Sequence, residues 1–371
     1  MAGRAGLPQP ERYGKMTREH TKQIHVGSVA VGGGAPVSVQ SMCNTPTPDA
    51  DATLLQIRRL AAAGCDIIRV AVPDAAAADA MERICAESPL PVVADIHFDY
   101  RLALRCAGAG AAKIRINPGN IGGAEHVRAV AEACGARGIP IRIGINAGSL
   151  EKRLLEKYGA PTAEALVESA ADHAALLERF GFTDICLSLK SSSVPLTLAA
   201  YRLAAQRFPY PLHLGVTEAG TLRQGTIQSA MGIGAALLDG IGDTIRVSLT
   251  ADPEEEVRVG LAILKAAGLR GGGPKVISCP TCGRTQIDLI AAAQDVERRL
   301  EGSALDITVA VMGCVVNGPG EAREADYGLA GGRGEAALFR KGEIVRKVPE
   351  SGMVDALMAL IEEDTKDKRN R

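Results

Sequence analysis

The feature that most constrains the fold is a regular alternation of short apolar segments with longer amphipathic segments between residues 37 and 267. The apolar segments have the length and β-branched content of buried strands, and the segments between them have apolar residues at helical spacing. Strands are expected at 37–42, 66–72, 91–96, 112–116, 139–145, 184–189, 211–216 and 243–248. Helices are expected at 50–63, 75–87, 100–109, 122–137, 162–180, 195–208, within 221–238, and at 253–267.

Eight strand–helix pairs in about 250 residues match the size and count of a (β/α)8 TIM barrel. An open, doubly wound sheet is the alternative. That fold loses support because Val39–Cys43, the first strand and the residue after it, carries no glycine fingerprint for a dinucleotide. Residues 23–31 are expected to form a hairpin before the barrel, and residues 1–16 a loose tail. The alternation therefore predicts a TIM-barrel domain over residues 1–267.

A glycine-rich stretch at 268–274 is the clearest linker in the chain. Beyond it the pattern changes to strands near 275–278, 306–312, 336–340 and 343–348, with helices near 285–300 and 353–362. This predicts a small α+β domain over residues 275–371.

Charged side chains gather where the barrel strands end, the face on which such barrels place their sites. Side chains alternate along a strand, so residues two apart share a face, and isoleucine and valine fill the other positions. We therefore expect the following cations and polar side chains to point inward, as a binding site: Arg69, Arg115, Asn117, Arg142, Asn146, Lys190, Arg246 and Ser248. Only Asp95 and Glu218 are expected to offset the cations.

A single inward arginine is often half of a buried ion pair, but four arginines and a lysine near one mouth exceed what two carboxylates neutralise. Burying unpaired like charges costs several kcal/mol each unless an anion is present. Guanidinium groups suit phosphate oxygens. The pattern predicts a small ligand with two or more phosphate charges.

Three further side chains are candidates for acid–base work in this mouth. Glu218 is a carboxylate among cations and could transfer a proton to the ligand, or could be a plain partner of an arginine. His97 and His213 could orient the ligand, or could be ordinary core histidines.

Three thiols in the small domain form a candidate metal site: Cys279 and Cys282, two residues apart around a turn, and Cys314 after an apolar strand. Glu321 follows a Gly-Pro-Gly loop that could return it to the same point. Three thiolates and a carboxylate suit an iron–sulfur cluster with one labile iron. A structural zinc site is the alternative, although no histidine follows His213 to complete one.

The composition excludes several classes of function. The net charge is −1 and tryptophan is absent, so neither a general field nor stacking platforms for nucleic acid are expected. No apolar run approaches the ~20 residues of a membrane-spanning helix, and no export signal precedes the barrel. We expect a cytoplasmic protein without nucleic-acid or membrane partners.

Six segments resemble the bacterial 4-hydroxy-3-methylbut-2-enyl diphosphate synthase family. They are ADIHF at 94–98, KIRINPGN at 113–120, RIGINAGS at 142–149, LHLGVTEAG at 212–220, ISCPTCG at 277–283 and VMGCVVNGPGE at 311–321. The resemblance runs from about residue 20 to about residue 335 and matches the two-domain bacterial form.

The resemblance implies a [4Fe–4S] cluster on Cys279, Cys282, Cys314 and Glu321. It implies an iron–sulfur oxidoreductase that opens and dehydroxylates 2-C-methyl-D-erythritol 2,4-cyclodiphosphate in the non-mevalonate isoprenoid pathway. It implies single electrons from a ferredoxin or flavodoxin, and a head-to-tail homodimer in which the cluster domain of one subunit caps the barrel of the other. Glu218 is then the candidate proton donor.

Two other functions stay open from the residues alone. One is a non-redox barrel enzyme of pterin-synthase type with a structural zinc in its tail. The other is an iron–sulfur sensor, which would not need an arginine-lined mouth.

Overall fold

The computed structural model describes residues 17–117, 119–303, 305–314 and 323–369, without the side chains of 366–369. The chain forms two compact units, residues 1–270 and 271–371. Each is described by itself.

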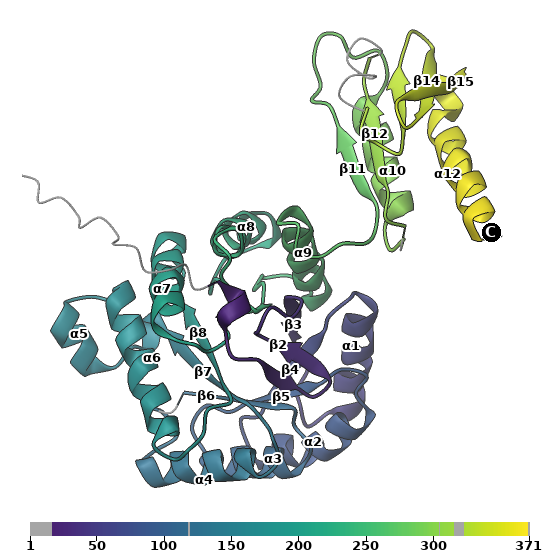
Figure 1. The fold of residues 1–371 in the computed structure, drawn as a ribbon. Coiled ribbons are helices and arrows are strands. Elements are labelled where there is room, and N and C mark those ends of the chain that lie inside the picture. Colours follow the sequence, from purple (N-terminus) through teal and green to yellow (C-terminus); the bar gives the residue numbers. More distant parts are fainter. Residues whose placement is uncertain (1–16, 118, 304, 315–322, 370–371) are drawn as a thin grey trace, which may run out of the picture. The chain divides into compact units, whose positions relative to one another are not determined.

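The first unit is a parallel eight-stranded barrel (Figure 1), as the alternation predicted. The strands are β3 (Ser38–Met42), β4 (Ile67–Ala71), β5 (Val92–Asp95), β6 (Lys113–Ile116), β7 (Ile141–Asn146), β8 (Ile185–Lys190), β9 (His213–Leu214) and β10 (Thr244–Ile245). Their order is β8-β7-β6-β5-β4-β3-β10-β9. A parallel bridge between Leu187 and Leu212 brings β8 against β9, so the barrel is nearly closed.

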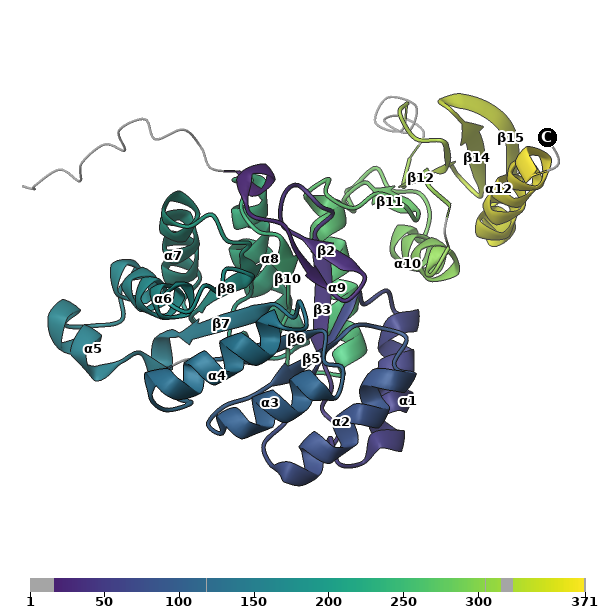
Figure 2. The ribbon, with the colours of Figure 1, turned by 60° about the horizontal axis from the view of Figure 1, so that its bottom comes forward.

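Helices surround the strands (Figure 2). They are α1 (Ala50–Ala62), α2 (Ala75–Glu87), α3 (Tyr100–Gly108), α4 (Ala124–Gly135), α5 (Lys152–Tyr158), α6 (Ala163–Glu178), α7 (Val194–Arg207), α8 (Leu222–Leu238) and α9 (Pro253–Ala266). Several begin where a side-chain oxygen accepts from a backbone N–H, as Asp49 does for α1 and Asp74 for α2. The outward isoleucines and valines of the strands pack on these helices and form the main core.

The amino-terminal end of the barrel is plugged by the expected hairpin, β1 (Ile24–Val26) and β2 (Val29–Val31). Ile24, Val26 and Val31 pack against inward side chains at the starts of the strands, Ile67, Val93 and Cys186. In the described structure the hairpin therefore covers this end of the barrel with apolar side chains, and the other end, at the carboxyl ends of the strands, carries the pocket.

The last residue of the first unit is held at this same end. Both terminal nitrogens of Arg270 contact the carboxylate of Asp66, at 2.6 and 3.0 Å, and Asp66 immediately precedes β4. Oδ2 of Asp66, the oxygen that contacts Nη1 of Arg270, also accepts a hydrogen bond from the backbone N–H of Val39 at 2.7 Å. The chain therefore leaves the barrel opposite its mouth.

The second unit has a five-stranded sheet in the order β11-β12-β13-β14-β15. The strands are β11 (Lys275–Ser278), β12 (Thr308–Met312), β13 (Tyr327–Gly331), β14 (Glu335–Arg340) and β15 (Glu343–Pro349); the first three are parallel and the last two join antiparallel. Helices α10 (Leu289–Leu300) and α12 (Met353–Arg369) pack on the sheet through one apolar core.

The structure corrects some expected boundaries in this unit. Helix α10 begins at Leu289 rather than near 285, because Asp288 caps it and residues 285–286 instead bond back to Cys282 and Gly313. Strand β13 was missed because two glycines, Gly328 and Gly331, interrupt its pattern. Gly328 is needed there because a Cβ would lie 2.2 Å from the ring of Phe339.

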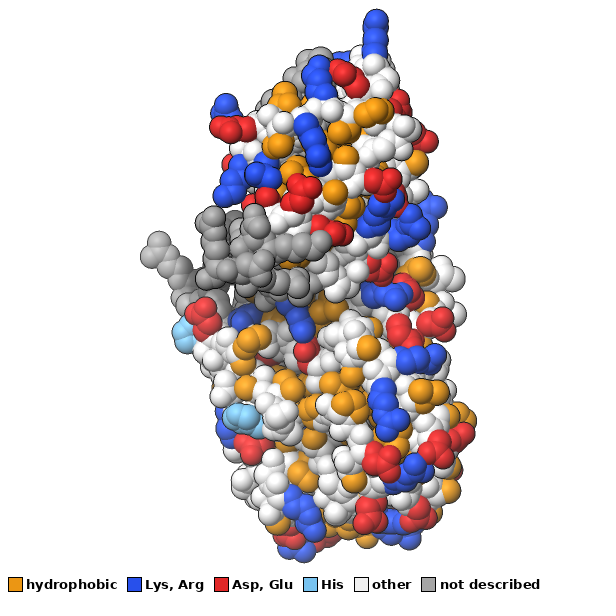
Figure 3. Space-filling view, turned by 90° about the vertical axis from the view of Figure 1, so that its right-hand side faces the viewer, with side chains coloured by type: hydrophobic (Ala, Val, Ile, Leu, Met, Phe, Trp, Pro, Cys, Tyr) orange, Lys and Arg blue, Asp and Glu red, His pale blue; other side chains and the backbone are white. Residues whose placement is uncertain are grey.

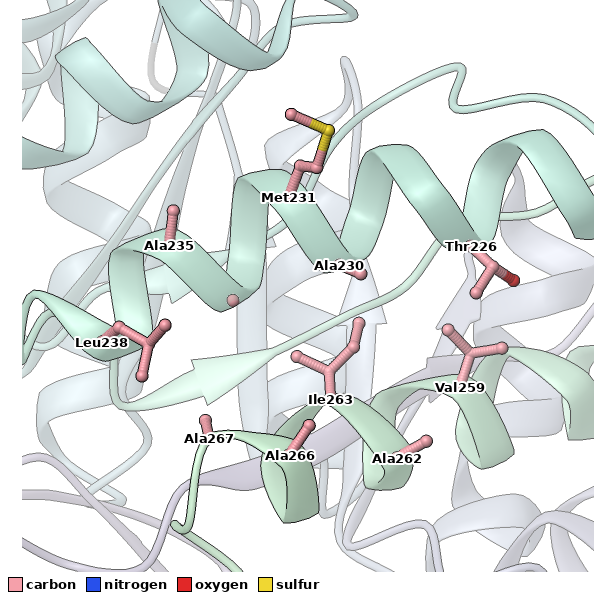
Figure 4. Close-up of a pocket in the computed structure, with 11 residues that line it drawn as sticks. Thr226, Ala230, Met231, Ala235, Leu238, Val259, Ala262, Ile263, Ala266 and Ala267 are labelled. Atoms are coloured by element: carbon pink, nitrogen blue, oxygen red, sulfur yellow. The ribbon is translucent and has the colours of Figure 1, made fainter. Parts of the chain in front are cut away.

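The surface agrees with the near-zero net charge. The face drawn in Figure 3 carries acidic and basic side chains interspersed rather than in patches of one sign. Among the described helices, none is long and apolar enough to span a membrane. An apolar groove runs between α8 and α9, lined by side chains that include Met231, Leu238 and Ile263 (Figure 4).

Candidate functional site

A pocket opens at the carboxyl ends of the barrel strands, and its lining is almost wholly polar. The side chains come from β4, β5, β6, β7, β8 and the segments that follow β9 and β10. The lining consists of Arg69, Asp95, His97, Arg115, Arg142, Gly144, Asn146, Ser188, Lys190, Thr217, Arg246 and Ser248. The period-two alternation of the strands thus places all five expected cations at one mouth.

Two carboxylates, Asp95 and Glu256, partly balance these cations. Asp95 contacts Arg115 at 3.0 Å and Arg69 at 3.6 Å. Burial would raise the pKa of Asp95, but the guanidiniums of Arg69 and Arg115 outweigh it and lower the pKa to about 2. Asp95 is therefore ionised at neutral pH and fixes the two arginines.

The expectation that Asp95 and Glu218 alone offset the cations is wrong. Glu256 on α9 contacts Arg246 at 3.3 Å and also accepts from the backbone N–H of Leu249. Glu218 is exposed, and no ion pair to it occurs within the described ranges. The sequence pattern could not show this because Glu256 belongs to a helix, in a run of three glutamates.

Arg142 and Lys190 have no ion-pair partner among the residues that the structure describes. Nε and Nη2 of Arg142 are buried without a hydrogen bond, and the residue is 1% exposed. Burial, followed by the charge of Arg115, lowers the pKa of Arg142 to about 10. Burial and then Arg142 lower the pKa of Lys190 well below its usual value. Five cations against two carboxylates leave a site suited to an anion.

Glycine at two inward positions makes room for these cations. A Cβ on Gly144 would lie 2.7 Å from Nε of Arg115, and a Cβ on Gly215 would lie 2.9 Å from Nζ of Lys190. Gly144 occupies the inward position between Arg142 and Asn146 on β7. Any larger residue there would enter the space of the Arg115 guanidinium.

The other predicted residues divide between the pocket and its surroundings. Asn146, Ser248 and His97 line the pocket. The side chain of His97 is half-exposed, and its Nε2 lies 4.0 Å from a carboxylate oxygen of Asp95. The Asn117 side chain instead accepts from the backbone N–H of Gly119 and is not among the lining residues. His213 does not line the pocket either: it is fully buried in the barrel.

Glu218 directly follows the lining residue Thr217 and has a left-handed backbone, with φ of 54°. A non-glycine residue adopts this conformation at a cost on the order of 1 kcal/mol. Strain of this kind is often found at functional positions.

Ser188 and Thr217 were missed as site residues. Ser188 lies two residues before Lys190 on β8, so the period that identified Lys190 also indicates Ser188. Thr217 lies in an irregular segment after β9, where no periodicity applies.

Two of the three candidate thiols follow the ends of neighbouring strands in the second sheet, and Cys282 is three residues after the first of them. Cys279 directly follows β11, and Cys314 lies two residues after β12, the neighbouring parallel strand. Cys279 Sγ accepts from the backbone N–H of Gly313 at 3.2 Å. The backbone N–H and the side chain of Arg284 lower the pKa of Cys282. A hydrogen-bonded sulfur and a thiol with a lowered pKa are suited to bind a metal centre.

The described residues do not by themselves bring three metal-ligating side chains together at one point. Glu321, the predicted fourth ligand, lies outside the described residues. The thiols present, on adjacent strand ends, fit the sulfur ligands of an iron–sulfur cluster.

Comparisons with known proteins cover both units. Residues 21–261 match the GcpE TIM-barrel domain, and residues 275–363 match the GcpE protein C-terminal domain. The chain is 64% identical over 342 residues to the 4-hydroxy-3-methylbut-2-en-1-yl diphosphate synthase (flavodoxin) of Geobacter sulfurreducens, covering 92% of this chain and 97% of the relative. It is 58% identical over 347 residues to the protein of the same name from Clostridium perfringens, covering 94% and 99%.

Among solved structures, the dihydropteroate synthase of Yersinia pestis matches with a TM-score of 0.47 and 15% identity, covering 66% of this chain and 98% of that one. The N-acetylneuraminic acid synthetase of Leptospira borgpetersenii matches with a TM-score of 0.49 and 12% identity, covering 76% and 97%.

The family assignment rests on the sequence comparisons, because they span both units and include each segment in which the resemblance was seen. With its cation-lined barrel and its thiol-bearing second unit, the chain belongs to the GcpE family of 4-hydroxy-3-methylbut-2-en-1-yl diphosphate synthases.

Proposed function

We propose that this protein reduces 2-C-methyl-D-erythritol 2,4-cyclodiphosphate to 4-hydroxy-3-methylbut-2-enyl diphosphate, in the non-mevalonate isoprenoid pathway. The observation that carries the proposal is the excess positive charge of the mouth. Five cations line it, and the described structure supplies two carboxylates near them. A ring with two phosphate groups provides the negative charge that the pocket lacks.

The pocket residues bind and orient this ring. Arg142 and Lys190 are the unpaired cations and are assigned to the phosphate oxygens, with Asn146 and Ser248 as neutral partners. Arg69 and Arg115 are held by Asp95, and Arg246 by Glu256, so these guanidiniums are fixed before the ligand arrives. Preorganised cations cost little to arrange on binding.

The departing hydroxyl needs a proton, and Glu218 is assigned as its donor. It is exposed beside Thr217 at the mouth, and its left-handed backbone fixes the direction in which the side chain leaves the chain. His97, with one nitrogen near Asp95, is assigned to orient the substrate. His213 has no direct part because it is buried below the lining.

The cofactor is a [4Fe–4S] cluster held by Cys279, Cys282, Cys314 and Glu321. When bound, it supplies the electrons that break the carbon–oxygen bond. The proposal is supported by the thiols at adjacent strand ends and by the hydrogen bond from Gly313 to Cys279. We assign flavodoxin as the electron donor because the relatives carry that donor in their names.

A head-to-tail homodimer is part of the proposal, and the linker supports it. Arg270 is fixed at the amino-terminal end of the barrel, opposite the mouth. The nine residues from there to Cys279 span at most ~30 Å when extended. A path to the same barrel's pocket must cover the ~21 Å of α9, which has 14 residues, and then cross the helix layer to the axis. Action on the same barrel would use most of this reach, and the proposal is that the cluster acts on the barrel of a second copy instead.

The deciding experiment combines metal analysis with turnover. Protein purified without oxygen is expected to be brown, with about four iron and four sulfide per chain, and to convert the cyclodiphosphate with a strong reductant. Cys314→Ser is expected to lose the cluster spectrum and turnover, whereas Cys85→Ser, a thiol outside the site, keeps both. A colourless protein with one zinc and no reductive turnover would support the non-redox alternative instead.

A further inference from the structure

Strand β6 carries a second inward cation beneath the pocket. Lys113 lies two residues before Arg115, so both side chains point into the barrel, with Lys113 one layer deeper. It is fully buried, and its ammonium nitrogen has no hydrogen-bond partner within the described structure. Lys113 is not among the residues that line the pocket, and the binding of the ring does not use it directly.

Among the residues that the structure describes, no carboxylate forms an ion pair with Lys113. In register beside it on β5 is Val93, which belongs to the apolar plug at the bottom of the barrel. Asp95, the inward carboxylate of β5, is committed to Arg69 and Arg115. Titratable and charged groups of this interior in the described structure include Arg69 on β4, Arg142 on β7, Cys186 and Lys190 on β8, His213 on β9, Asp243 just before β10 and Arg246 just after it.

The remaining inward groups of this layer are neutral. Gln40 on β3 and Thr244 on β10 each have a side-chain polar atom that is buried without a partner among the described residues. They can hydrogen-bond to a lysine in either protonation state but cannot balance its charge. An ammonium group here is therefore a buried, unpaired cation below five others, which is the costly case for a charge in a protein interior.

Removing that cost requires either the loss of a proton or the arrival of negative charge. Burial is the largest cause of a lowered pKa for Lys113; with Cys186 opposing it and the charges of Arg142 and Arg69 adding to it, the pKa falls to about 8. A diphosphate in the pocket directly above brings two negative charges into the same low-dielectric interior, where they are screened less than at a surface.

We propose that Lys113 is the proton-linked cation of this site: it takes up a proton when a diphosphate occupies the pocket above it and holds that charge while the ligand is bound. The inference rests on the proposed function, because it deepens the account of how the same pocket binds its ligand. Lys113 is a positioning residue. Its charge acts on the ligand through space and through the side chains of Arg115 and Arg142.

The sign of the effect follows from linkage. At pH 6 the free enzyme already carries the proton, so binding takes up almost none through Lys113. At pH 9 about nine-tenths of the free enzyme lacks it, so binding takes up close to one proton, and affinity falls by about tenfold per pH unit above pH 8. Lys190 and His213 also have pKa values lowered by burial and can add proton uptake of their own. Variants separate these contributions.

The test is calorimetric titration of the cluster-loaded protein without reductant, so that the ligand binds but does not turn over. Titrations at pH 6 and pH 9, in buffers with different ionisation enthalpies, give the protons taken up. The probes are the cyclodiphosphate and inorganic pyrophosphate. Wild-type protein is expected to take up nearly one proton more at pH 9 than Lys113→Met, and the two are expected to agree at pH 6. Lys113→Arg, with a permanent charge, is expected to lose the extra uptake but keep tight binding at pH 9.

Equal uptake by wild type and Lys113→Met at pH 9 would overturn the inference. If neither variant folds, the wild-type profile decides: uptake that does not rise between pH 7 and pH 9 contradicts it. Binding of pyrophosphate with the expected uptake, but none of the cyclodiphosphate, would refute the proposed substrate and leave the role of Lys113 standing. If neither the cyclodiphosphate nor pyrophosphate binds, both the proposed substrate and the role of Lys113 are refuted.

Discussion

At the scale of single residues, the site is defined by which charges are paired. Asp95 and Glu256 hold three arginines in place, and Arg142 and Lys190 remain for the ligand. Glu218 is the one carboxylate at the mouth that is exposed and adjacent to the lining while pairing with none of these cations in the described part of the chain. This exposure and the absence of such a pair support its proposed role as the proton donor.

Replacing Glu218 by glutamine tests that role. Glu218→Gln keeps the size and hydrogen-bonding reach of the side chain but removes the transferable proton. We expect the affinity for the cyclodiphosphate to change less than threefold and turnover to fall by about 10²- to 10⁴-fold. Glu164→Gln, an exposed glutamate in the first turn of α6, is the control. Turnover within twofold of wild type in Glu218→Gln would assign the proton to another group.

At the scale of secondary structure, the alternation of side chains along each strand decides which residues face the barrel interior. On β7 the inward positions are Arg142, Gly144 and Asn146. The glycine is as necessary as its neighbours because the Arg115 guanidinium lies over it. The helices contribute through packing and, in one case, directly, because α9 carries Glu256.

A methyl group on β7 tests this arrangement. Gly144→Ala places a Cβ 2.7 Å from Nε of Arg115, so the guanidinium must move away from Asp95. Losing one hydrogen bond to a charged group costs about 1.5–3 kcal/mol, and we expect the affinity for the cyclodiphosphate to fall by roughly 10- to 150-fold. The thermal unfolding midpoint is the control measurement, since the contacted atoms end a flexible side chain. Gly148→Ala, where a Cβ meets no atom within 4 Å, is expected to bind normally.

A second element-level prediction concerns the closed end of the barrel. Asp243, just before β10, accepts from the backbone N–H of Leu212 at 2.8 Å and from the Thr21 hydroxyl at 3.0 Å. Burial raises its pKa to about 6, against these hydrogen bonds. A raised carboxyl pKa means that ionisation costs more in the folded state. The free energy of unfolding therefore decreases as the pH rises from about 4 to about 6, by about 3 kcal/mol.

Asp243→Asn removes this dependence. Chemical unfolding curves between pH 4 and pH 7 are expected to show a smaller loss of stability with rising pH in the variant than in wild type. Asp239→Asn, at the residue that directly follows α8, is the control: its carboxylate forms a surface ion pair with Arg202, a kind of pair that contributes little, so the variant should follow wild type. Parallel curves for Asp243→Asn and wild type would contradict the raised pKa.

At the scale of the whole molecule, two units that fold on separate cores must cooperate in one reaction. Residues 1–270 provide the anion pocket and residues 271–371 the thiols. The anchor of Arg270 on Asp66 sets where the connection begins. In the proposed homodimer, the thiols of one copy act at the pocket of the other.

Mixed dimers test this arrangement. Arg142→Met, defective in the pocket, and Cys314→Ser, defective in the cluster, are each expected to be inactive. If clusters act on the partner's barrel, a one-to-one mixture that exchanges subunits recovers about a quarter of wild-type activity, because half of the dimers then contain one intact site. No recovery, with subunit exchange verified by two affinity tags, would show that each cluster serves its own barrel.

Much of this organisation could be predicted from local patterns alone. The alternation of apolar segments specified the barrel, and the period-two placement of Arg115, Arg142 and Arg246 indicated an inward cationic mouth, because strand geometry makes every second residue face the same way. The spacing of Cys279 and Cys282 likewise pointed to a metal site, since ligand spacing is a local property.

Other features were decided only in three dimensions. Glu256 reaches Arg246 from a helix, His213 lies below the pocket rather than in it, and Gly144 is required by a side chain from the neighbouring strand. The way in which several strands and a helix meet decides which cations are paired. It also leaves Lys113 without a partner within the described residues. Charge balance is a sum over neighbours in space, so no pattern along one segment contains it, whereas the direction of a strand residue is set by the backbone on either side of it.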